Sequence, residues 1–240
     1  MKRAPKPTKP LQVAPLCIAL SSLAGALHVH AEAPMHTDDA GTLTQGAMKL
    51  EGVFSRDDKT RGAELLFGAG VAPQLEMEVS LAHAKDTAMN PSTTVHRRGW
   101  GVKWVPIQNE TGWSVGARFD MGHSRVRDHA TPQRFTDRET ALTALASYRL
   151  ANAQVLHLNA GHKIFRAQGT RHRAATWAMG YEIPLTEPLQ LTSEVYGEQR
   201  SRPDKAVGLR YAITDGLKAS AAVGRGNGRT FSQVGMAWEF

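Results

Sequence analysis

Residues 75–82 read LEMEVSLA, and this stretch decides the fold class. Apolar residues occupy its odd positions, and glutamate or serine follows each of the first three of them. Because successive side chains of a β-strand point to opposite faces, the stretch predicts a strand with one apolar and one polar face. A helix would repeat its apolar positions every three to four residues, and the chain shows little of that period.

The same alternation recurs along most of the chain. It predicts twelve strands, at about residues 47–55, 62–71, 75–84, 97–106, 112–121, 139–150, 154–163, 173–183, 189–199, 205–213, 217–225 and 229–240. Most of these segments are nine to twelve residues long, and a tilted strand needs about 9–11 residues to cross a bilayer. The pattern therefore predicts an all-β chain whose strands are long enough to span a membrane.

The predicted connections differ in length. Residues 72–74, 184–188 and 214–216 are short and rich in turn-forming residues, whereas residues 85–96, 122–138 and 164–172 are longer and polar. Short turns at one end and longer loops at the other are typical of a transmembrane β-barrel. The segment Gly224–Arg229 lies between two predicted strands, so its glycines indicate a tight hairpin and not a phosphate-binding loop.

The first 31 residues differ in character from the rest of the 240-residue chain. A basic head containing Lys2, Arg3, Lys6 and Lys9 precedes a mostly apolar stretch, and Ala31 ends a small-residue cleavage motif. This layout predicts a secretory signal peptide over residues 1–31, with cleavage after Ala31 or after Ala33. The alternative interpretation is a lipoprotein signal peptide that ends at Cys17, but a leucine precedes that cysteine where a small residue is expected.

Removal of that segment changes the charge and cysteine content. The whole chain carries 29 basic and 22 acidic residues; residues 1–31 hold four of the basic ones and no acidic one, so the net charge falls from +7 to +3. A high positive charge is the main indication of a nucleic-acid partner, and most of that charge is lost with the segment. Cys17 is the only cysteine, which excludes a disulfide framework or a cysteine metal site. A hydrophobic fraction of 41% also excludes a wholly disordered chain.

Charge lies on one register of the predicted strands. In a soluble β-protein that register would face bulk water, whereas in a membrane barrel it faces the lumen. The opposite register is nearly free of charge, and a charge facing the bilayer costs several kcal/mol. We therefore expect these side chains to line a polar lumen: Lys49, Glu51, Glu64, Glu76, Glu78, Lys103, Arg118, Asp120, Arg149, His157, Lys163, Glu182, Glu194, Arg210 and Lys218.

Aromatic side chains lie on the apolar register near the short turns or the end of the chain. Amphipathic rings favour the headgroup level of a bilayer, whereas a soluble core would place large rings at strand centres. The predicted aromatic girdle comprises Trp104, Trp113, Tyr148, Tyr181, Tyr211, Trp238 and Phe240. A soluble secreted β-protein remains the alternative, because aromatic residues are enriched in strands generally.

The last strand carries a resemblance. Val234, Met236, Trp238 and Phe240 alternate with small or polar residues, and this stretch resembles the terminal strand of bacterial outer-membrane proteins. With the signal peptide, it makes the chain similar to small Gram-negative, porin-like outer-membrane barrels. The resemblance implies a closed antiparallel up-and-down transmembrane β-barrel of about twelve strands over residues 47–240, preceded by a periplasmic segment over 32–46. It also implies recognition by the barrel-assembly machinery through the last strand.

Two functions remain open at this stage. A lumen with charges of both signs fits a narrow passive channel for small solutes, or the charges pair and close a structural or surface-interaction barrel. The histidines lack ligand spacing and no serine stands beside them in a catalytic motif, so we expect no enzyme, metal or cofactor. Basic residues assigned to the long loops predict contact with lipopolysaccharide phosphates: Arg97, Arg98, Arg125, Arg127, Arg134, Arg138, Arg166, Arg171, Arg173, Arg200 and Arg202.

Overall fold

The computed structural model describes residues 32–88, 90–130 and 134–240, so the expected signal peptide and Cys17 lie outside the described residues. Twelve strands are described, and each matches one predicted from the alternation. They are β1 (Met48–Asp57), β2 (Thr60–Ala72), β3 (Leu75–Asp86), β4 (Thr93–Ile107), β5 (Gly112–Asp128), β6 (Arg134–Arg149), β7 (Val155–Ala167), β8 (Thr170–Pro184), β9 (Leu189–Glu198), β10 (Asp204–Ala212), β11 (Leu217–Gly226) and β12 (Arg229–Glu239). Within the described ranges, no helix is long and apolar enough to span a membrane.

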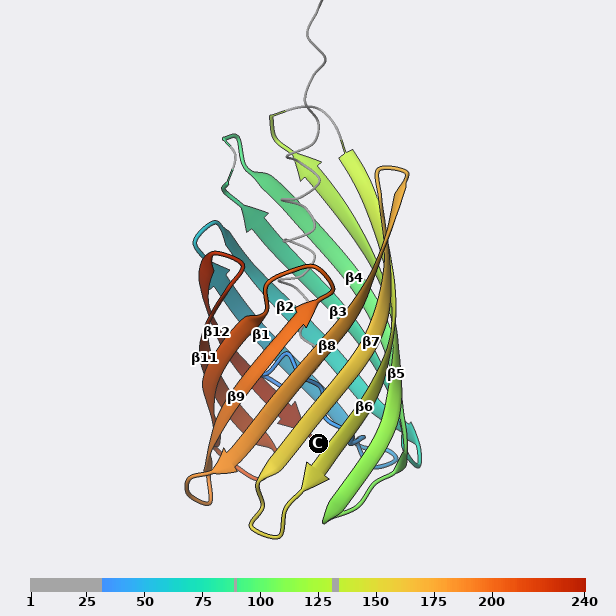
Figure 1. The fold of residues 1–240 in the computed structure, drawn as a ribbon, viewed down its shortest axis with the longest axis vertical. Helices are drawn as coiled ribbons and strands as arrows, with labels where there is room; N and C mark the ends of the chain where they lie inside the picture. The colour runs from blue at the N-terminus through green and yellow to red at the C-terminus, as the bar shows by residue number, and fades with distance from the viewer. Residues whose placement is uncertain (1–31, 89, 131–133) are drawn as a thin grey trace, which may run out of the picture.

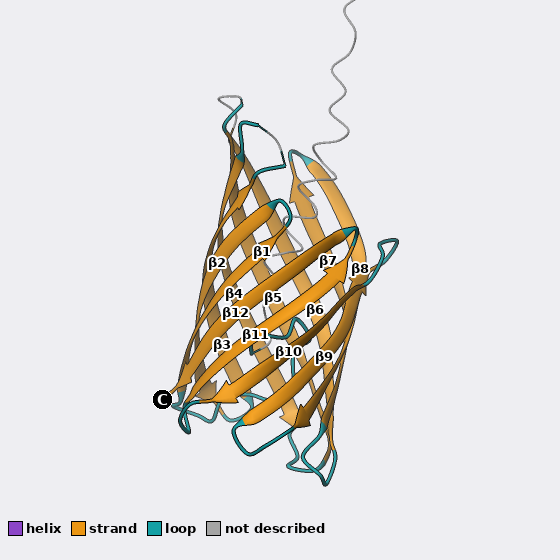
Figure 2. Cartoon of the chain, turned by 90° about the vertical axis from the view of Figure 1, so that its left-hand side faces the viewer, coloured by secondary structure: helices purple, strands orange, loops and turns teal. Residues whose placement is uncertain are grey.

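The strands form one closed antiparallel barrel in which each pairs with its neighbours in the chain. The seam joins β1 to β12, where Leu50 lies opposite Trp238 and Phe54 opposite Val234. The backbone N–H of Met48 also donates to the carbonyl oxygen of Phe240 at 2.8 Å. Closure leaves no unpaired sheet edge, which a lipid environment requires. The fold predicted from the sequence, an up-and-down twelve-stranded barrel, is confirmed (Figures 1 and 2).

The two ends of the barrel can be told apart by the chain. We call the end that holds Met48 and Phe240 the near end, and the end that holds the β1–β2 connection the far end. The sequence predicted long loops at the far end, and this was wrong. Strands β4 to β8 continue through most of those residues, and β7 and β8 are joined by Gln168 and Gly169 alone.

The physical reason for this error lies in the faces of the strand extensions. Within the apolar band an outward residue is hydrophobic and an inward one is polar, so the alternation is visible. In the extensions the outward residues are polar, as Arg134 and Thr136 of β6 are. The inward register there mixes polar and apolar residues: Asp137 is acidic, whereas Phe135 packs against buried Val95 and Val126. The contrast between an apolar outer and a polar inner face is therefore lost. The turn at Gln168-Gly169 has φ of 48° and 80° and carries a weaker sequence signal than the Asn227-Gly228 turn, which has the same positive φ values of 48° and 78°.

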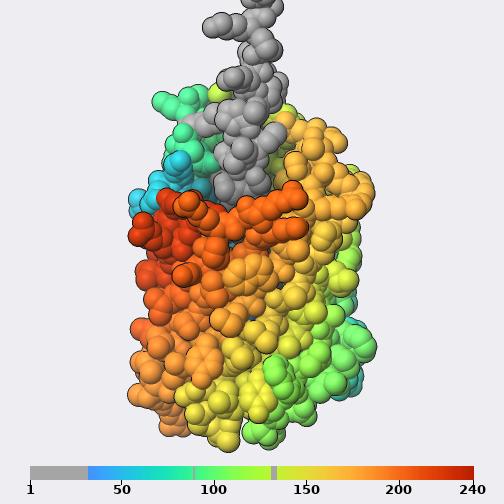
Figure 3. Space-filling model, in the orientation of Figure 1, coloured from blue at the N-terminus to red at the C-terminus, as the bar shows by residue number. Residues whose placement is uncertain are grey.

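The wall has the sidedness of a membrane barrel. Val79 is 55% exposed on the outside, whereas its neighbour Glu78 is 4% exposed and faces inward. The same contrast holds on β5, between outward Val115 and inward Arg118. Side chains of the middle strands cover the outer surface continuously (Figure 3). The soluble alternative, with apolar side chains packed inside and charged ones in bulk water, is contradicted.

Candidate functional site

The lumen is the site that the fold builds. Alternation directs one side chain in two from every strand toward the barrel axis. Of the fifteen charged or histidine residues expected there, the structure buries eleven: Lys49, Glu51, Glu64, Glu76, Glu78, Lys103, Arg118, Asp120, His157, Glu194 and Arg210. The other four, Arg149, Lys163, Glu182 and Lys218, lie half-buried on the same register.

The aromatic residues expected in the girdle lie on the outer face at the near end. Trp104 and Phe240 are each 55% exposed, and Trp113 packs against Tyr148 in a tilted arrangement with ring centroids 5.0 Å apart. Trp238 and Phe240 pack together at 4.5 Å. Tyr211 is exposed and Tyr181 half-buried. These rings surround the end of the barrel where both terminal strands meet.

Ion pairs connect opposite charges across the inner wall. Lys49 lies 3.0 Å from Glu78 and 3.2 Å from Glu76. Arg118 contacts Glu78 directly and donates from Nε to Asp120 at 2.9 Å. Because buried charges are costly unless paired and hydrogen-bonded, this network explains how so many ionised groups fit in one narrow cylinder.

A segment of chain also lies in the lumen. Residues 32–46, which precede β1 and which we call the luminal segment, cross the lower half of the barrel (Figure 1). Met35 and Thr37 are each only 2% exposed. The sequence predicts that these residues lie ahead of the barrel, on its periplasmic side; the structure places them inside the wall.

Charged wall residues bind the middle of the luminal segment. Lys103 lies 3.0 Å from both Asp38 and Asp39, and Arg118 lies 3.3 Å from Asp38. Burial raises the pKa of the Asp38 carboxyl, and the charges of Lys103 and Arg118 oppose that shift. Burial acts in the same direction on Asp39, but the charges of Lys103, His157 and Lys49 and the hydrogen bond from Lys103 together outweigh it and lower the pKa of that carboxyl. The middle of the luminal segment is therefore acidic and is bound by basic side chains of the wall.

Backbone hydrogen bonds hold the same segment along its length. The carboxylate of Glu194 accepts bonds from the backbone N–H groups of His36 and Thr37, both at 2.8 Å. Asn159 makes a reciprocal pair with Asp38, accepting from its N–H at 2.7 Å and donating to its carbonyl oxygen at 2.9 Å. Buried backbone groups need such partners, so the wall supplies the hydrogen bonds that a strand or helix would otherwise provide.

Further basic residues of the wall bind the start of the luminal segment. Arg210 donates from Nε to the carbonyl oxygen of Ala33 at 3.0 Å and from Nη2 to that of Glu32 at 2.8 Å. The N–H of Ala33 donates to Glu51 at 2.8 Å. Lys218 lies 2.8 Å from the Glu32 carboxylate. Several residues expected to line the lumen, such as Glu51 and Arg210, thus contact the luminal segment and are buried from solvent.

Glycines on the inward register leave room for the segment. A Cβ at Gly180 would lie 2.3 Å from the methyl carbon of Met35, and one at Gly208 would lie 2.8 Å from the ring of Pro34. At Gly235 it would lie 2.8 Å from the Cβ of Ala33. Three strands therefore lack a side chain where the segment passes. This is the sequence signal that could have revealed the segment: glycine at inward positions where other strands carry polar side chains.

A cavity extends from the luminal segment toward the far end. It has a volume of about 720 Å³ and reaches from His36 and Asp38 to Asp58 and Lys59 in the β1–β2 turn. Acidic and basic side chains line it together, and several are paired: Arg229 with Asp57 at 2.9 Å, and Lys163 with Glu198. Charged side chains therefore line the lumen between the luminal segment and the far end. Toward the near end the luminal segment itself fills the lumen.

The described part of the chain holds no group of three or more His, Cys, Asp or Glu side chains that could bind a metal ion. Within the described ranges, His83 and His96 are in contact on the outer face, with their Nδ1 atoms 3.4 Å apart. Ser147 and His157 lie 2.8 Å apart in the lumen, but the N–H of Ala40 donates to the same serine hydroxyl at 2.7 Å. That pair therefore serves to hold the luminal segment.

Comparison with known proteins places the fold among outer-membrane barrels. The model of the family described as uncharacterised conserved protein UCP029691 matches residues 19–233. None of the curated proteins compared matches the chain. The KdgM porin is similar at 12% identity and a TM-score of 0.59, covering 80% of this chain and 99% of its own.

Two further solved structures have the same architecture. The COG4313 outer-membrane channel from Pseudomonas putida F1 is similar at 10% identity and a TM-score of 0.62, over 84% of this chain and 98% of its own. The translocator domain of the autotransporter NalP from Neisseria meningitidis gives a TM-score of 0.59 at 10% identity, over 95% and 98%. At such low identity the likeness shows the fold of an outer-membrane barrel and nothing finer.

Proposed function

This chain belongs to the family described as uncharacterised conserved protein UCP029691, and from its geometry we propose that it is a narrow passive channel for small solutes in the outer membrane of a Gram-negative bacterium. The observation that carries the proposal is the charged cavity of about 720 Å³ inside a closed twelve-stranded wall. Passive channels select by the width and charge of such a lumen.

The luminal segment sets the narrowest part of the proposed pathway. It contacts β1 through Glu51, β4 through Lys103, β7 through Asn159 and β10 through Arg210, so its anchors lie on well-separated parts of the wall. A solute that moves from the cavity to the near end must pass this segment. We expect the near end to face the periplasm, because both terminal strands and the predicted girdle lie there.

Mixed charge gives the proposed pathway a weak preference for ion sign. The cavity is lined by Arg118, Lys163 and Arg229 among the basic residues, and by more acidic residues than basic ones. Most of those whose contacts are described are in ion pairs, so the excess of acidic side chains leaves only a weak negative field. We therefore expect small neutral or weakly charged solutes to pass.

Single-channel recording in planar bilayers tests the proposal. The wild-type protein should give small conductance steps, and a variant lacking residues 33–45 should give steps several times larger, because the segment no longer fills the lower lumen. Gly180→Leu should enlarge the steps partially by displacing Met35, whereas outward Met179→Leu is the matched control and should leave them unchanged.

Each possible recording decides between the two functions. Steps from the wild type that grow on deletion support a channel constricted by the luminal segment. If neither the wild type nor the deletion variant conducts, and heat-modifiable migration in detergent gels shows that both are folded, the proposed channel function is contradicted. Steps from the deletion variant alone would favour the second candidate, a barrel closed by its own chain, for which the many anchors of the segment are the supporting observation.

A further inference from the structure

The two faces of the barrel wall carry different charges: the inner face holds both signs, and the outer face holds basic residues only. Every acidic residue of the described strands lies on the inward register: Glu51, Asp57, Glu64, Glu76, Glu78, Asp86, Asp120, Asp128, Asp137, Glu139, Glu182, Glu194, Glu198, Asp204 and Glu239. Every charged residue on their outward register is basic: Arg56, Arg61, Lys85, Arg98, Arg125, Arg127, Arg134, Arg138, Arg166, Arg171, Arg173, Lys205 and Arg225. All of the latter lie in the far half of their strands, and we call them the basic outer band.

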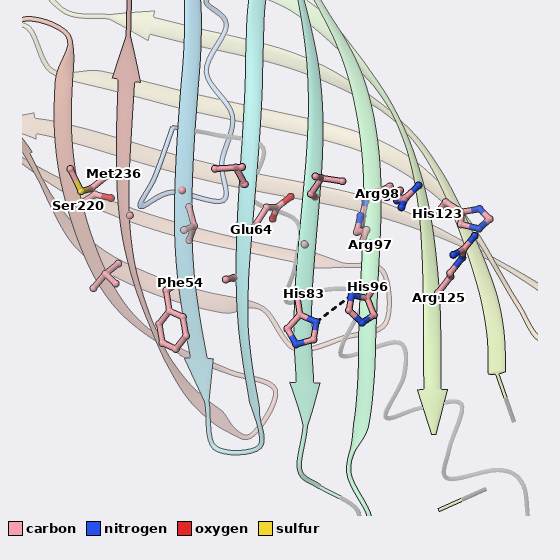
Figure 4. Close-up of a pocket in the computed structure, with 18 of the residues that line it drawn as sticks. Phe54, Glu64, His83, His96, Arg97, Arg98, His123, Arg125, Ser220 and Met236 are labelled. Carbon is pink, nitrogen blue, oxygen red and sulfur yellow. Dashed lines mark hydrogen bonds between the residues drawn. The ribbon is translucent and has the colours of Figure 1, made fainter. Parts of the chain in front are cut away.

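The band is densest on β4 to β8. Arg98 lies directly opposite His123, His123 opposite Arg138, Arg138 opposite Arg166, and Arg166 opposite Arg171, so one row crosses five strands. A parallel row begins with His96 opposite Arg125. Figure 4 shows His83, His96, Arg98, His123 and Arg125 on the neighbouring strands β3, β4 and β5.

Such a row is unfavourable by itself. Like charges directly opposite each other on neighbouring strands destabilise a sheet. None of Arg98, Arg138 and Arg166 forms an ion pair with any residue in the described ranges. The inner wall shows that this chain pairs charges where it can: Arg97, next to Arg98 but inward, lies 3.3 Å from Glu139. The outer row therefore needs an anion from outside the chain.

The position of the row identifies that anion. On the strands that carry the band, it lies beyond the outward apolar residues, toward the far end. On β4 Arg98 is the next outward residue beyond Trp100, and on β6 Arg138 lies four residues beyond Leu142. This is the level at which the lipid headgroups meet the wall of a membrane barrel. Guanidinium groups bind phosphate oxygens in a bidentate manner, and several together at one site are typical of phosphate recognition.

We infer that the outer face of β4 to β8 is a binding site for the phosphorylated headgroup of lipopolysaccharide, with Arg98, Arg138 and Arg166 as its central contacts. His123 lies between two of these arginines in the row and supplies a further ring N–H donor. The site is separate from the lumen, because its side chains point away from the axis. It also stands independently of whether the barrel conducts.

Binding of lipid A, with and without its phosphates, to detergent-purified protein tests the site by native mass spectrometry. The variant carries Arg98→Gln, Arg138→Gln and Arg166→Gln together. Each basic residue near an anionic surface contributes about a factor of five, so the triple change should weaken binding roughly 100-fold. The control carries Arg56→Gln, Lys205→Gln and Arg225→Gln, the same change of charge in the band on β1, β10 and β11. Because these residues lie outside the row on β4 to β8, the control should weaken binding by no more than about fivefold, the contribution of one basic residue.

The wild type alone supplies a second arm that depends on no variant. Lipid A without phosphates should bind far more weakly than the phosphorylated lipid, and millimolar inorganic phosphate should not displace the phosphorylated lipid. Equal binding of the two lipids, equal loss in both triple variants, or displacement by inorganic phosphate alone would each overturn a lipid phosphate site on β4 to β8. Heat-modifiable migration checks that both triple variants are folded barrels.

Discussion

Two adjacent residues of β4 show how differently the two faces of this wall treat charge. Arg97 is 5% exposed inside the barrel, where it lies 3.3 Å from Glu139. Arg98 is exposed on the outside and lies opposite His123 and Leu81. The inner face satisfies its charges with partners from the chain, whereas the outer face carries one sign only. The inner charges therefore contribute to the stability of this fold, and the outer ones do not.

Removal of an inner charge should have the largest effect. Arg118→Met leaves Glu78, Asp120 and Asp38 without their common partner. Breaking a buried ion pair on one side costs about 3–5 kcal/mol, because the remaining charge is buried and uncompensated. Urea unfolding of the barrel in lipid vesicles measures this loss.

The outer neighbour provides the control for that measurement. Arg98→Met removes the same side-chain charge from the other face and should change the free energy of unfolding by less than about 1 kcal/mol. Equal losses of unfolding free energy for the two variants would show that the inner network does not stabilise the fold more than the outer charges do.

A new charge on the outer face should have an effect that depends on its height. Leu142 is 59% exposed in the apolar band of β6, and Thr136 is outward on the same strand within the basic outer band. Leu142→Arg should destabilise the barrel by about 2–4 kcal/mol, whereas Thr136→Arg should cost about 0–1 kcal/mol. The same unfolding assay compares them. Similar costs at the two positions would mean that the apolar band does not contact acyl chains.

The smallest effect should come from the edge of the inner network. Asp39 has a side chain that is 41% exposed, whereas the side chain of Asp38, bound to the same Lys103, is 5% exposed. Asp39→Asn should cost less than about 1 kcal/mol, since an exposed ion pair contributes little. Asp38→Asn should cost clearly more in the same unfolding measurement. A larger loss at Asp39 would place the main anchor of the luminal segment at the wrong carboxylate.

The fold could be predicted from the sequence because one physical rule acts on every strand within the bilayer. Lipid outside and water or charge inside force alternation, and LEMEVSLA on β3 shows it without interruption. The same rule failed beyond the apolar band. There the outward residues of β6, such as Arg134 and Thr136, are polar, and the inward register holds apolar Phe135 as well as Asp137. The contrast between the two faces that marks a strand within the bilayer is therefore lost.

The site was less predictable, for a different reason. Alternation assigned Lys103, Arg118 and Glu194 to the inward register, but it does not say what they bind there. Their partners lie in residues 32–46, which have no regular structure and therefore no period to detect. The glycines facing that segment, such as Gly180, are informative only when the inward register is already known. Contacts that join an irregular segment to distant strands need the three-dimensional structure.

The seam between β1 and β12 has a consequence for how the molecule assembles. It joins the strands that are farthest apart in the chain, so the cylinder cannot be completed until nearly all of it has been synthesised. The luminal segment precedes β1 directly and is anchored on β6 to β10, which are made later. Threading a tethered peptide into a finished cylinder would be slow. We therefore expect the segment to act as a template around which the sheet curls before its two edges meet.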